Sequence, residues 1–216
     1  RLAVYDSVAI AQMNAEENDG AYEQKAAELI RKQSTMPIVC AYHLFHDRNV
    51  IQRGASALLN ARLLPVIDEF LEAVHCSMRL RDLNCPVVIM RSDGSLMNET
   101  YARNHPVETL LCGPAASVMG GAYLGHYPKS VIIDMGGTTS DIALVKDDLP
   151  IRAENGIQIG SWRTFVKGLY VDTFGLGGDS EICYHESELF LSDRRVMPLC
   201  ILAAQYPDIF RIFDNL

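Results

Sequence analysis

The sequence predicts an α/β protein in which parallel strands joined by crossover helices precede a glycine-turn β-hairpin. Up to Met90, short apolar runs alternate with helical periodicity in the order strand, helix, strand, helix, strand. This order is typical of a mainly parallel sheet, because consecutive parallel strands need a crossover connection. After residue 130, two apolar runs flank Gly136 and Gly137, which indicates an antiparallel hairpin.

The N-terminal elements follow from hydrophobic periodicity. Residues 8–13 and 38–44 are apolar runs of strand length, and residues 21–33 between them place their apolar side chains on one helical face. A long helical pattern covers residues 55–81. Pro65 lies inside this pattern and predicts a kink or two abutting helices, because proline removes a helical hydrogen bond.

The middle of the chain adds a third strand and a helix of small residues. Residues 87–90 form a β-branched run that ends in the turn Ser92-Asp93-Gly94. Gly113-Pro114 precedes a helix over residues 115–124, with proline at a position typical of a helix start. Tyr127-Pro128 is the best linker position and divides the chain into two parts.

The second part predicts short strands and a helical tail. Strand-like runs cover residues 131–135, 141–145, 149–153, 157–159 and 170–174. The last run enters the glycine-rich loop of residues 175–180, and residues 197–213 have a helical composition interrupted by two prolines.

The hairpin segment DMGGTTSD carries two acids at symmetric positions. Folding the segment about its centre places Asp134 opposite Asp141 and Met135 opposite Ser140. Directly opposed residues of an antiparallel pair project from the same face, so the two carboxylates stand side by side. Because like charges in this position repel, the pattern predicts a divalent cation such as Mg²⁺ between them.

The turn of this hairpin offers donors for phosphate oxygens. They are the backbone amides of Gly136 and Gly137 and the hydroxyls of Thr138, Thr139 and Ser140. The segment is not a Walker loop, since no Gly-Lys-Ser/Thr follows. The alternative interpretation is a plain hairpin turn whose acids cap the strand ends.

Two further segments are candidate nucleotide or substrate loops. Gly113 and Ala115 open a helix whose N-terminal amides suit an anion, although helix packing explains the small residues equally well. Gly177, Gly178 and Ser180 form the second candidate loop, with an ordinary connection as the alternative.

Composition excludes several functional classes. A net charge of −8 and a pI near 5.2 argue against a nucleic-acid-binding surface. No apolar run is long enough to span a membrane, and six cysteines without a C-x-x-C pair predict reduced, buried thiols in a cytoplasmic protein. The start at Arg1, without an initiator methionine, leads us to expect a fragment of a longer polypeptide.

Five blocks together resemble the hydantoinase A/5-oxoprolinase family of the actin- and sugar-kinase-like ATPase superfamily. The blocks are NARLLPVIDEFL, VVIMRSDGSLM, PVETLLCGPAASVMGGAYLG, IIDMGGTTSDIALV and VDTFGLGGDSEI. The resemblance covers about residues 8–182, and the GPAAS and DMGGTTSD blocks together make it specific.

The resemblance implies two RNase H-like lobes that close on ATP. Residues 1–128 would be the C-terminal part of the first lobe, and residues 129–216 the start of the second lobe with the phosphate-binding hairpin. The family pattern places six residues around the phosphates of ATP: Asp134, Gly136, Gly137, Thr138, Thr139 and Asp141.

The implied reaction is the ATP- and Mg²⁺-dependent hydrolysis of a cyclic amide of the hydantoin or 5-oxoproline type. A second hydantoinase-type subunit is the expected protein partner, and the fragment alone is expected to be inactive. An acetone-type carboxylase subunit is the first alternative. A non-catalytic module that binds nucleotide or supports assembly is the second.

The chain departs from the family pattern in three places. No first phosphate loop of the GGT type lies upstream of Val8. Asp179 stands where the family has a third glycine in its GGGS-like loop, and residues 183–196 lack the usual proline- and glycine-rich continuation.

Overall fold

The computed structural model describes residues 5–213, whose contacts form two compact units. Unit 1 contains the residues up to Ala116 together with Arg152–Tyr170, and unit 2 contains Ser117–Ile151 together with the residues from Val171 onward. Both units are therefore discontinuous in sequence. This division does not coincide with the single boundary expected at residue 128, and the assignment of two lobes stays a prediction.

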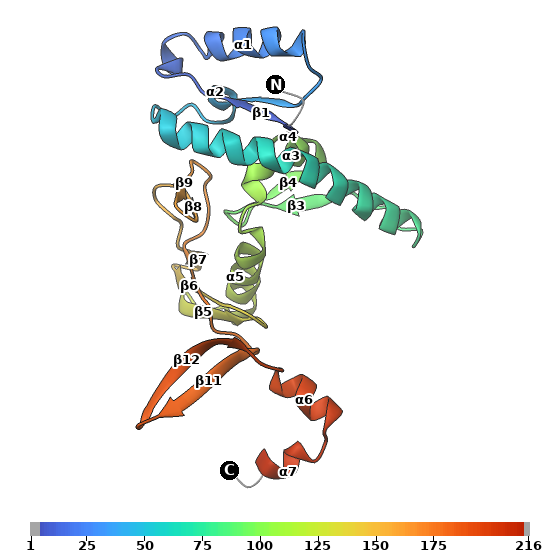
Figure 1. The fold of residues 1–216 in the computed structure, drawn as a ribbon, viewed down its shortest axis with the longest axis vertical. Coiled ribbons are helices and arrows are strands. Elements are labelled where there is room, and N and C mark those ends of the chain that lie inside the picture. Colours follow the sequence, from blue (N-terminus) through green and yellow to red (C-terminus); the bar gives the residue numbers. More distant parts are fainter. Residues whose placement is uncertain (1–4, 214–216) are drawn as a thin grey trace. The chain divides into compact units, whose positions relative to one another are not determined.

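Unit 1 is built around a short parallel sheet between helices. Strand β1 (Val8–Ile10) pairs with β2 (Ile38–Cys40) in parallel, with Val8 opposite Ile38. Helix α1 (Ala21–Arg31) lies on one side of these strands and α3 (Val50–Arg79) on the other, as Figure 1 shows. Side chains of β2, of the residue that follows β2 and of α3 form a core cluster: Val39, Ala41, Ala57 and Ala61. A 3₁₀ turn, η2 (Ala15–Glu17), precedes α1.

The strand expected over residues 38–44 is shorter in the structure. It ends at Cys40, and the one-turn helix α2 (Ala41–Leu44) follows. The amide of Tyr42 donates a hydrogen bond to the carboxylate of Glu23 at 2.9 Å rather than to a neighbouring strand. A contact from α1 therefore turns the chain out of the sheet, which the local sequence pattern does not show.

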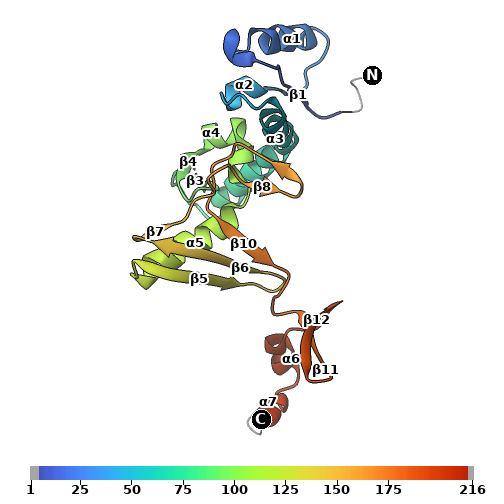
Figure 2. The same ribbon diagram turned by 90° about the vertical axis from the view of Figure 1, so that its left-hand side faces the viewer.

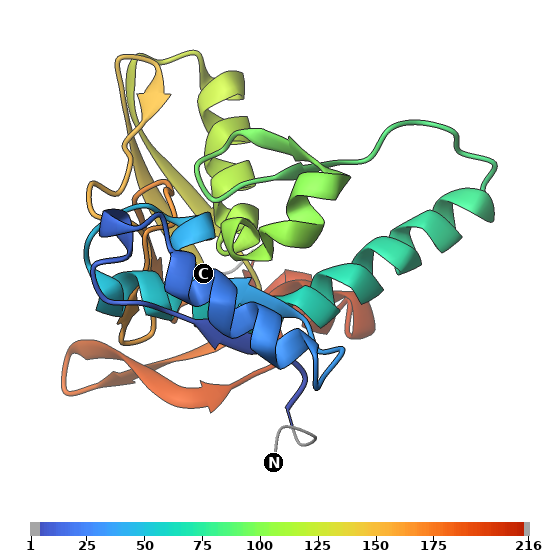
Figure 3. The same cartoon turned by 90° about the horizontal axis from the view of Figure 1, so that it is seen from above.

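Helix α3 is one continuous helix, so the expectation of two abutting helices at Pro65 is wrong, whereas a kink at this residue stays a prediction. The side chain of Asn49 caps its start by accepting hydrogen bonds from the amides of Ile51 and Gln52. Burial of Ala61 before the proline and of Leu71 after it holds both halves in place and offsets the lost hydrogen bond. Figure 3 shows the C-terminal part of α3 extending away from the other elements of unit 1.

The third strand does not join the parallel sheet as expected. Strand β3 (Val88–Met90) pairs antiparallel with β4 (Leu96–Asn98) around the predicted turn, where Gly94 has φ 81°. A nearby hairpin partner thus replaces the crossover pairing. The rest of unit 1 comprises α4 (Glu99–Asn104), η3 (Pro106–Thr109), the start of α5 (Cys112–Gly125), β8 (Gln158–Ile159) and β9 (Trp162–Arg163).

Unit 2 contains an antiparallel sheet with the order β10-β6-β5, to which β7 adds beside β6. Its strands are β5 (Lys129–Met135), β6 (Ser140–Lys146), β7 (Leu149–Pro150) and β10 (Val171–Phe174). From Ser117 onward, α5 packs on one face, where a Cβ on Gly121 would lie 2.9 Å from Cγ2 of Ile132 (Figure 2). The opposite face exposes Val131 and Ile133.

Two strands that the sequence did not predict follow the glycine loop. Strand β11 (Ser180–His185) pairs antiparallel with β12 (Glu188–Arg195), in the segment that departs from the family pattern. The helical tail is confirmed as α6 (Leu199–Gln205) and α7 (Ile209–Phe213).

The six cysteines are free thiols, but none of them is fully buried. Cys40, Cys112 and Cys183 are partly buried, whereas Cys200 is exposed although its neighbours are apolar. The expectation of buried thiols is therefore wrong, because a short apolar run does not by itself fix burial. Among the described residues, no helix is long and apolar enough to cross a membrane.

Candidate phosphate-binding site

The register expected for the hairpin is confirmed. Strands β5 and β6 pair with Asp134 opposite Asp141 and Met135 opposite Ser140. Both acids are partly exposed at the end of the strands that carries the turn. Because the register depends only on a four-residue turn and its flanking apolar runs, local sequence was sufficient to predict it.

A third strand extends the row of acids. Thr173 of β10 lies opposite Asp141, and its hydroxyl donates a hydrogen bond to Asp141 Oδ1 at 2.6 Å. Asp134, Asp141 and Thr173 therefore project from one face of the sheet, the same face as Ile132, which α5 covers. Thr173 thus orients one carboxylate of the pair.

The two carboxylates of Asp134 and Asp141 are suitable ligands for a Mg²⁺ ion that binds together with a nucleotide. Mg²⁺ commonly takes one or two carboxylates and fills its remaining positions with water and phosphate oxygens. The hairpin supplies two carboxylates, and within residues 5–213 no group of three or more His, Cys, Asp or Glu side chains could hold a metal. The residues therefore fit a magnesium site that phosphate oxygens and water complete, rather than a site in which the protein supplies all the ligands.

The turn between the strands lies on the surface. Residues 136–139 are all exposed, and the amide of Gly136 donates to the carbonyl of Thr139 at 2.8 Å, which closes the turn. In the described part of the chain, the amides of Gly137, Thr138 and Thr139 donate to no other residue. Consecutive free amides in a tight turn form a concave donor surface for an anion.

The glycine loop of residues 175–180 docks on the carbonyl side of the same turn. The amide of Gly178 donates to Gly136 O at 3.0 Å, and the amide of Asp179 donates to Gly137 O at 2.7 Å. Gly177 is buried, and a Cβ there would lie 2.5 Å from the carbonyl carbon of Thr138. The loop therefore supports the turn from one side and leaves its free amides available.

Two hydroxyls expected at the ligand are engaged within this loop. Ser140 is 4 % exposed, and its hydroxyl donates to the carbonyl of Leu176 at 2.6 Å. Ser180 Oγ accepts the amide of Gly177 at 2.9 Å. Both hydroxyls therefore take part in docking the loop, and a role for Ser140 or Ser180 in contacting phosphate or substrate stays a prediction.

The other expected anion site lies in unit 1. Gly113 is exposed, with no heavy atom within 4 Å of an added Cβ, whereas Ala115 is 1 % exposed and packs in the interior. Helix α5 begins at Cys112, so both residues lie inside its first turn. Burial of Ala115 explains the small residue by packing, and a ligand role for Gly113 stays a prediction.

Sequence reasoning missed two residues of the candidate site, Thr173 and Arg195. Thr173 becomes visible only when β10 is known to pair with β6. Nη1 of Arg195 lies 3.1 Å from the carbonyl oxygen of Thr138, a contact across 57 residues of sequence. No local pattern predicts either contact.

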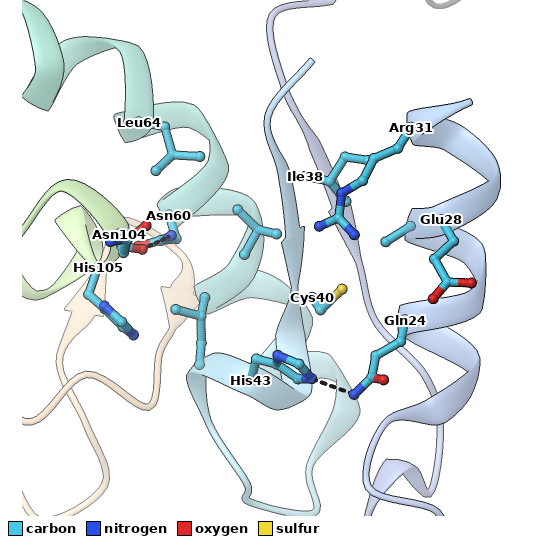
Figure 4. A pocket seen from close by; sticks show the side chains of 13 residues that line it. Gln24, Glu28, Arg31, Ile38, Cys40, His43, Asn60, Leu64, Asn104 and His105 are labelled. Atoms are coloured by element: carbon cyan, nitrogen blue, oxygen red, sulfur yellow. Dashed lines mark hydrogen bonds between the residues drawn. The ribbon is translucent and has the colours of Figure 1, made fainter. Parts of the chain in front are cut away.

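A separate cavity of about 630 Å³ lies in unit 1 between α1, β2 and α3 (Figure 4). Arg31, Cys40, His43 and His105 are among its lining residues, and Nε2 of His43 lies 2.9 Å from Nε2 of Gln24. Partial burial raises the pKa of the Cys40 thiol. The ring of His43 is thus hydrogen-bonded to the side-chain amide of Gln24.

Comparison with known proteins identifies relatives that share this region. The chain is 26% identical over 164 residues to the alpha subunit of caprolactamase from Pseudomonas jessenii, which covers 74% of the chain and 23% of the relative. It is 24% identical over 169 residues to the gamma subunit of acetophenone carboxylase from Aromatoleum aromaticum, again with 74% and 23% coverage. The chain thus spans about a quarter of the length of these relatives.

A solved structure shows the same fold. The crystal structure of the ATP-dependent caprolactamase from Pseudomonas jessenii matches 89% of the chain and 28% of its own chain, with a TM-score of 0.72 at 23% identity. The family model described as hydantoinase/oxoprolinase matches residues 53–194, which include the hairpin and the glycine loop. The chain therefore belongs to the hydantoinase/oxoprolinase family.

Proposed function

We propose that these residues belong to the ATP-dependent subunit of an enzyme that hydrolyses a cyclic amide. In this proposal the hairpin turn binds the terminal phosphates of ATP, and Asp134 and Asp141 hold Mg²⁺ through water. The family membership and the name of the caprolactamase relative support cyclic-amide chemistry, and the description of the solved caprolactamase as ATP-dependent supports ATP use. A second hydantoinase-type subunit is the proposed partner, since the caprolactamase relative is itself a subunit.

One observation carries the proposal: two opposed acids flank an exposed turn whose amides are free. The free amides would donate to the phosphate oxygens of ATP, and the two carboxylates would attract the Mg²⁺ ion that neutralises the phosphate charge. Phosphoryl transfer depends mostly on positioning and on neutralising charge, and this arrangement supplies both. A turn packed in the interior would have no access to a nucleotide.

The chemistry explains why ATP is needed. The carbonyl carbon of a cyclic amide reacts slowly with water because nitrogen donates electrons into the carbonyl group. Transfer of the terminal phosphoryl group of ATP to the amide oxygen releases ADP and makes this carbon electrophilic. Water then adds to this carbon and the ring C–N bond breaks, with a proton going to the released amine nitrogen, which leaves an acyl phosphate. A second water hydrolyses the acyl phosphate to a carboxylate and phosphate. The residues of the hairpin would bind and orient the phosphates in this sequence.

Calorimetric titration with Mg·ADP tests the site in the full-length polypeptide. We expect Asp134→Asn to weaken binding by roughly tenfold or more, because a charged ligand to the Mg²⁺ hydration shell is lost. Asp172→Asn is the matched control, since Asp172 lies opposite Ile142 in the same sheet and projects from the other face. Equal affinity of wild type and Asp134→Asn would count against the site.

The carboxylase relative supports an alternative function for the same fold. In that case ATP would activate a substrate for carboxylation, and ATP consumption by the complete enzyme would depend on bicarbonate. ATP consumption that instead depends on a lactam such as 5-oxoproline, with no bicarbonate present, supports the hydrolase. A non-catalytic module would bind Mg·ATP and release no phosphate with either substrate.

A further inference from the structure

Arg195, the last residue of β12, reaches both parts of the candidate site. Its Nη1 lies 3.1 Å from the carbonyl oxygen of Thr138 in the hairpin turn. The same nitrogen lies 3.0 Å from Asp179 Oδ1 and 3.0 Å from Ser180 Oγ, both in the glycine loop. One guanidinium nitrogen therefore joins the loop to the turn.

Asp179 is held by the same elements through its backbone. Its amide donates to Gly137 O at 2.7 Å, and its carbonyl accepts the amide of Val196 at 2.8 Å. The carboxylate completes the arrangement by pairing with Arg195. The end of β12 is thus fixed to the loop on two sides, and the loop is fixed to the turn.

Two departures from the family pattern are therefore in direct contact. Asp179 replaces the expected third glycine, and Arg195 comes from the segment that lacks the usual continuation. We propose that they form a clamp in which Arg195 is a positioning residue that holds the turn of residues 136–139 in its phosphate-binding conformation. The identity of the ligand, a phosphate group, rests on the proposed function. The contacts that form the clamp do not depend on it.

The clamp acts on geometry more than on stability. The side chains of Arg195 and Asp179 are 45% and 24% exposed, so water screens their attraction and the ion pair adds little to the free energy of unfolding. The turn contains two glycines and lies on the surface, so its backbone has many accessible conformations. A donor fixed to the Thr138 carbonyl reduces this freedom before the nucleotide binds.

The first experiment measures Mg·ADP affinity and melting temperature in the full-length polypeptide. We expect Arg195→Ala to weaken binding roughly tenfold, the effect of losing one charge-assisted hydrogen bond, with little change in melting temperature. Arg195→Lys should restore part of the affinity, because an ammonium group still donates to the Thr138 carbonyl. Arg194→Ala is the matched control, since Arg194 pairs with Glu181 on the neighbouring strand at 3.9 Å.

A second measurement tests the clamp without nucleotide. The amides of Gly178 and Asp179 donate to the turn, so their hydrogen exchange reports whether loop and turn stay together. We expect faster exchange in Arg195→Ala and in Asp179→Asn than in Arg194→Ala. Should Arg195→Ala fail to fold, Asp179→Asn and Arg195→Lys decide the question by the same two readouts.

The outcomes separate this inference from the proposed function. Wild-type exchange and wild-type affinity in the Arg195 and Asp179 variants, with binding still lost in Asp134→Asn, would overturn the clamp alone. Faster exchange in the clamp variants, with wild-type protein that does not bind Mg·ADP, would support the clamp and overturn the nucleotide site.

Discussion

At the residue scale, two fully buried charges organise unit 1. The carboxylate of Glu23 accepts the amides of Gln12 at 2.8 Å and Tyr42 at 2.9 Å, two residues beyond the ends of β1 and β2. The guanidinium of Arg53 donates to the carbonyls of Gln12 and Asp47. Backbone groups rather than an opposite charge therefore bond both oxygens of Glu23 and both Nη atoms of Arg53, and each side chain ties a helix to a strand end. Within the described residues, Nε of Arg53 has no hydrogen-bond partner.

Substitution of Glu23 should destabilise the protein strongly. We expect Glu23→Ala to lower the free energy of unfolding by about 3 kcal/mol, because a fully buried carboxylate is removed and two partly buried amides lose their charged acceptor. Glu28→Ala on the exposed side of the same helix should change it by less than about 0.5 kcal/mol. Urea denaturation measures both, and similar values for the two variants would contradict the role of Glu23.

Tyr101 should titrate at unusually high pH. Burial, and a hydrogen bond from its hydroxyl to Glu108 Oε1 at 2.8 Å, raise the pKa of Tyr101 to about 12. The folded protein thus favours the neutral phenol, whose pKa in the unfolded chain is about 10. The resulting contribution to stability is complete below about pH 10 and is lost as the pH rises through 12.

The difference in ultraviolet absorbance between wild type and Tyr101→Phe isolates this group. We expect the difference signal to rise with a midpoint near pH 12 while the protein remains folded. A midpoint near that of a free tyrosine would show that Glu108 does not act on the phenol.

At the scale of elements, the site consists of a hairpin and a loop that dock through backbone atoms. The sequence predicted strands β5 and β6 and their register, because alternating apolar residues around a short turn specify one pairing. It did not predict that residues 175–180 lie against this turn or that Arg195 reaches it, since these contacts join residues 36 and 57 positions apart. The hairpin β11–β12 was not predicted, because its two-residue turn, Glu186-Ser187, contains neither glycine nor asparagine.

Gly177 is the critical position for this docking. A Cβ there would lie 2.6 Å from the carbonyl oxygen of Gly137 and 2.5 Å from the carbonyl carbon of Thr138, and backbone cannot give way as a flexible side chain does. We therefore expect Gly177→Ala to displace the turn, lowering both the melting temperature and the affinity for Mg·ADP. Gly175→Ala in the same loop is the control, because no heavy atom lies within 4 Å of its added Cβ. Equal effects of the two substitutions would exclude close packing as the cause.

At the scale of the whole molecule, the chain covers about a quarter of the length of its relatives, and its contacts form two discontinuous units. The hairpin turn of residues 136–139, the glycine loop and the proposed clamp all belong to unit 2. The buried charges and the cavity beside β2 belong to unit 1. Enzymatic activity therefore has to be measured on the full-length polypeptide rather than on these 216 residues alone.

The 216-residue chain alone should not turn over a cyclic amide. The chain spans about a quarter of the length of its relatives, and these 216 residues contain one Gly-Gly-Thr sequence, at residues 136–138, whereas the family resemblance implies two such phosphate loops. Incubation with Mg·ATP and 5-oxoproline should release no phosphate above the spontaneous rate. Ring opening at an enzymatic rate by the purified chain would refute this expectation.

The sequence by itself determined the family, the hairpin and the opposition of Asp134 and Asp141, because these features depend on residues close together in the chain. Only the tertiary structure decided which residues surround them. Thr173 is hydrogen-bonded to Asp141, Ser140 to the glycine loop, and Arg195 to the carbonyl of Thr138 in the turn. The physical reason is that such contacts form when separate segments pack. Their partners are chosen by the shape of the whole unit, which no local periodicity records.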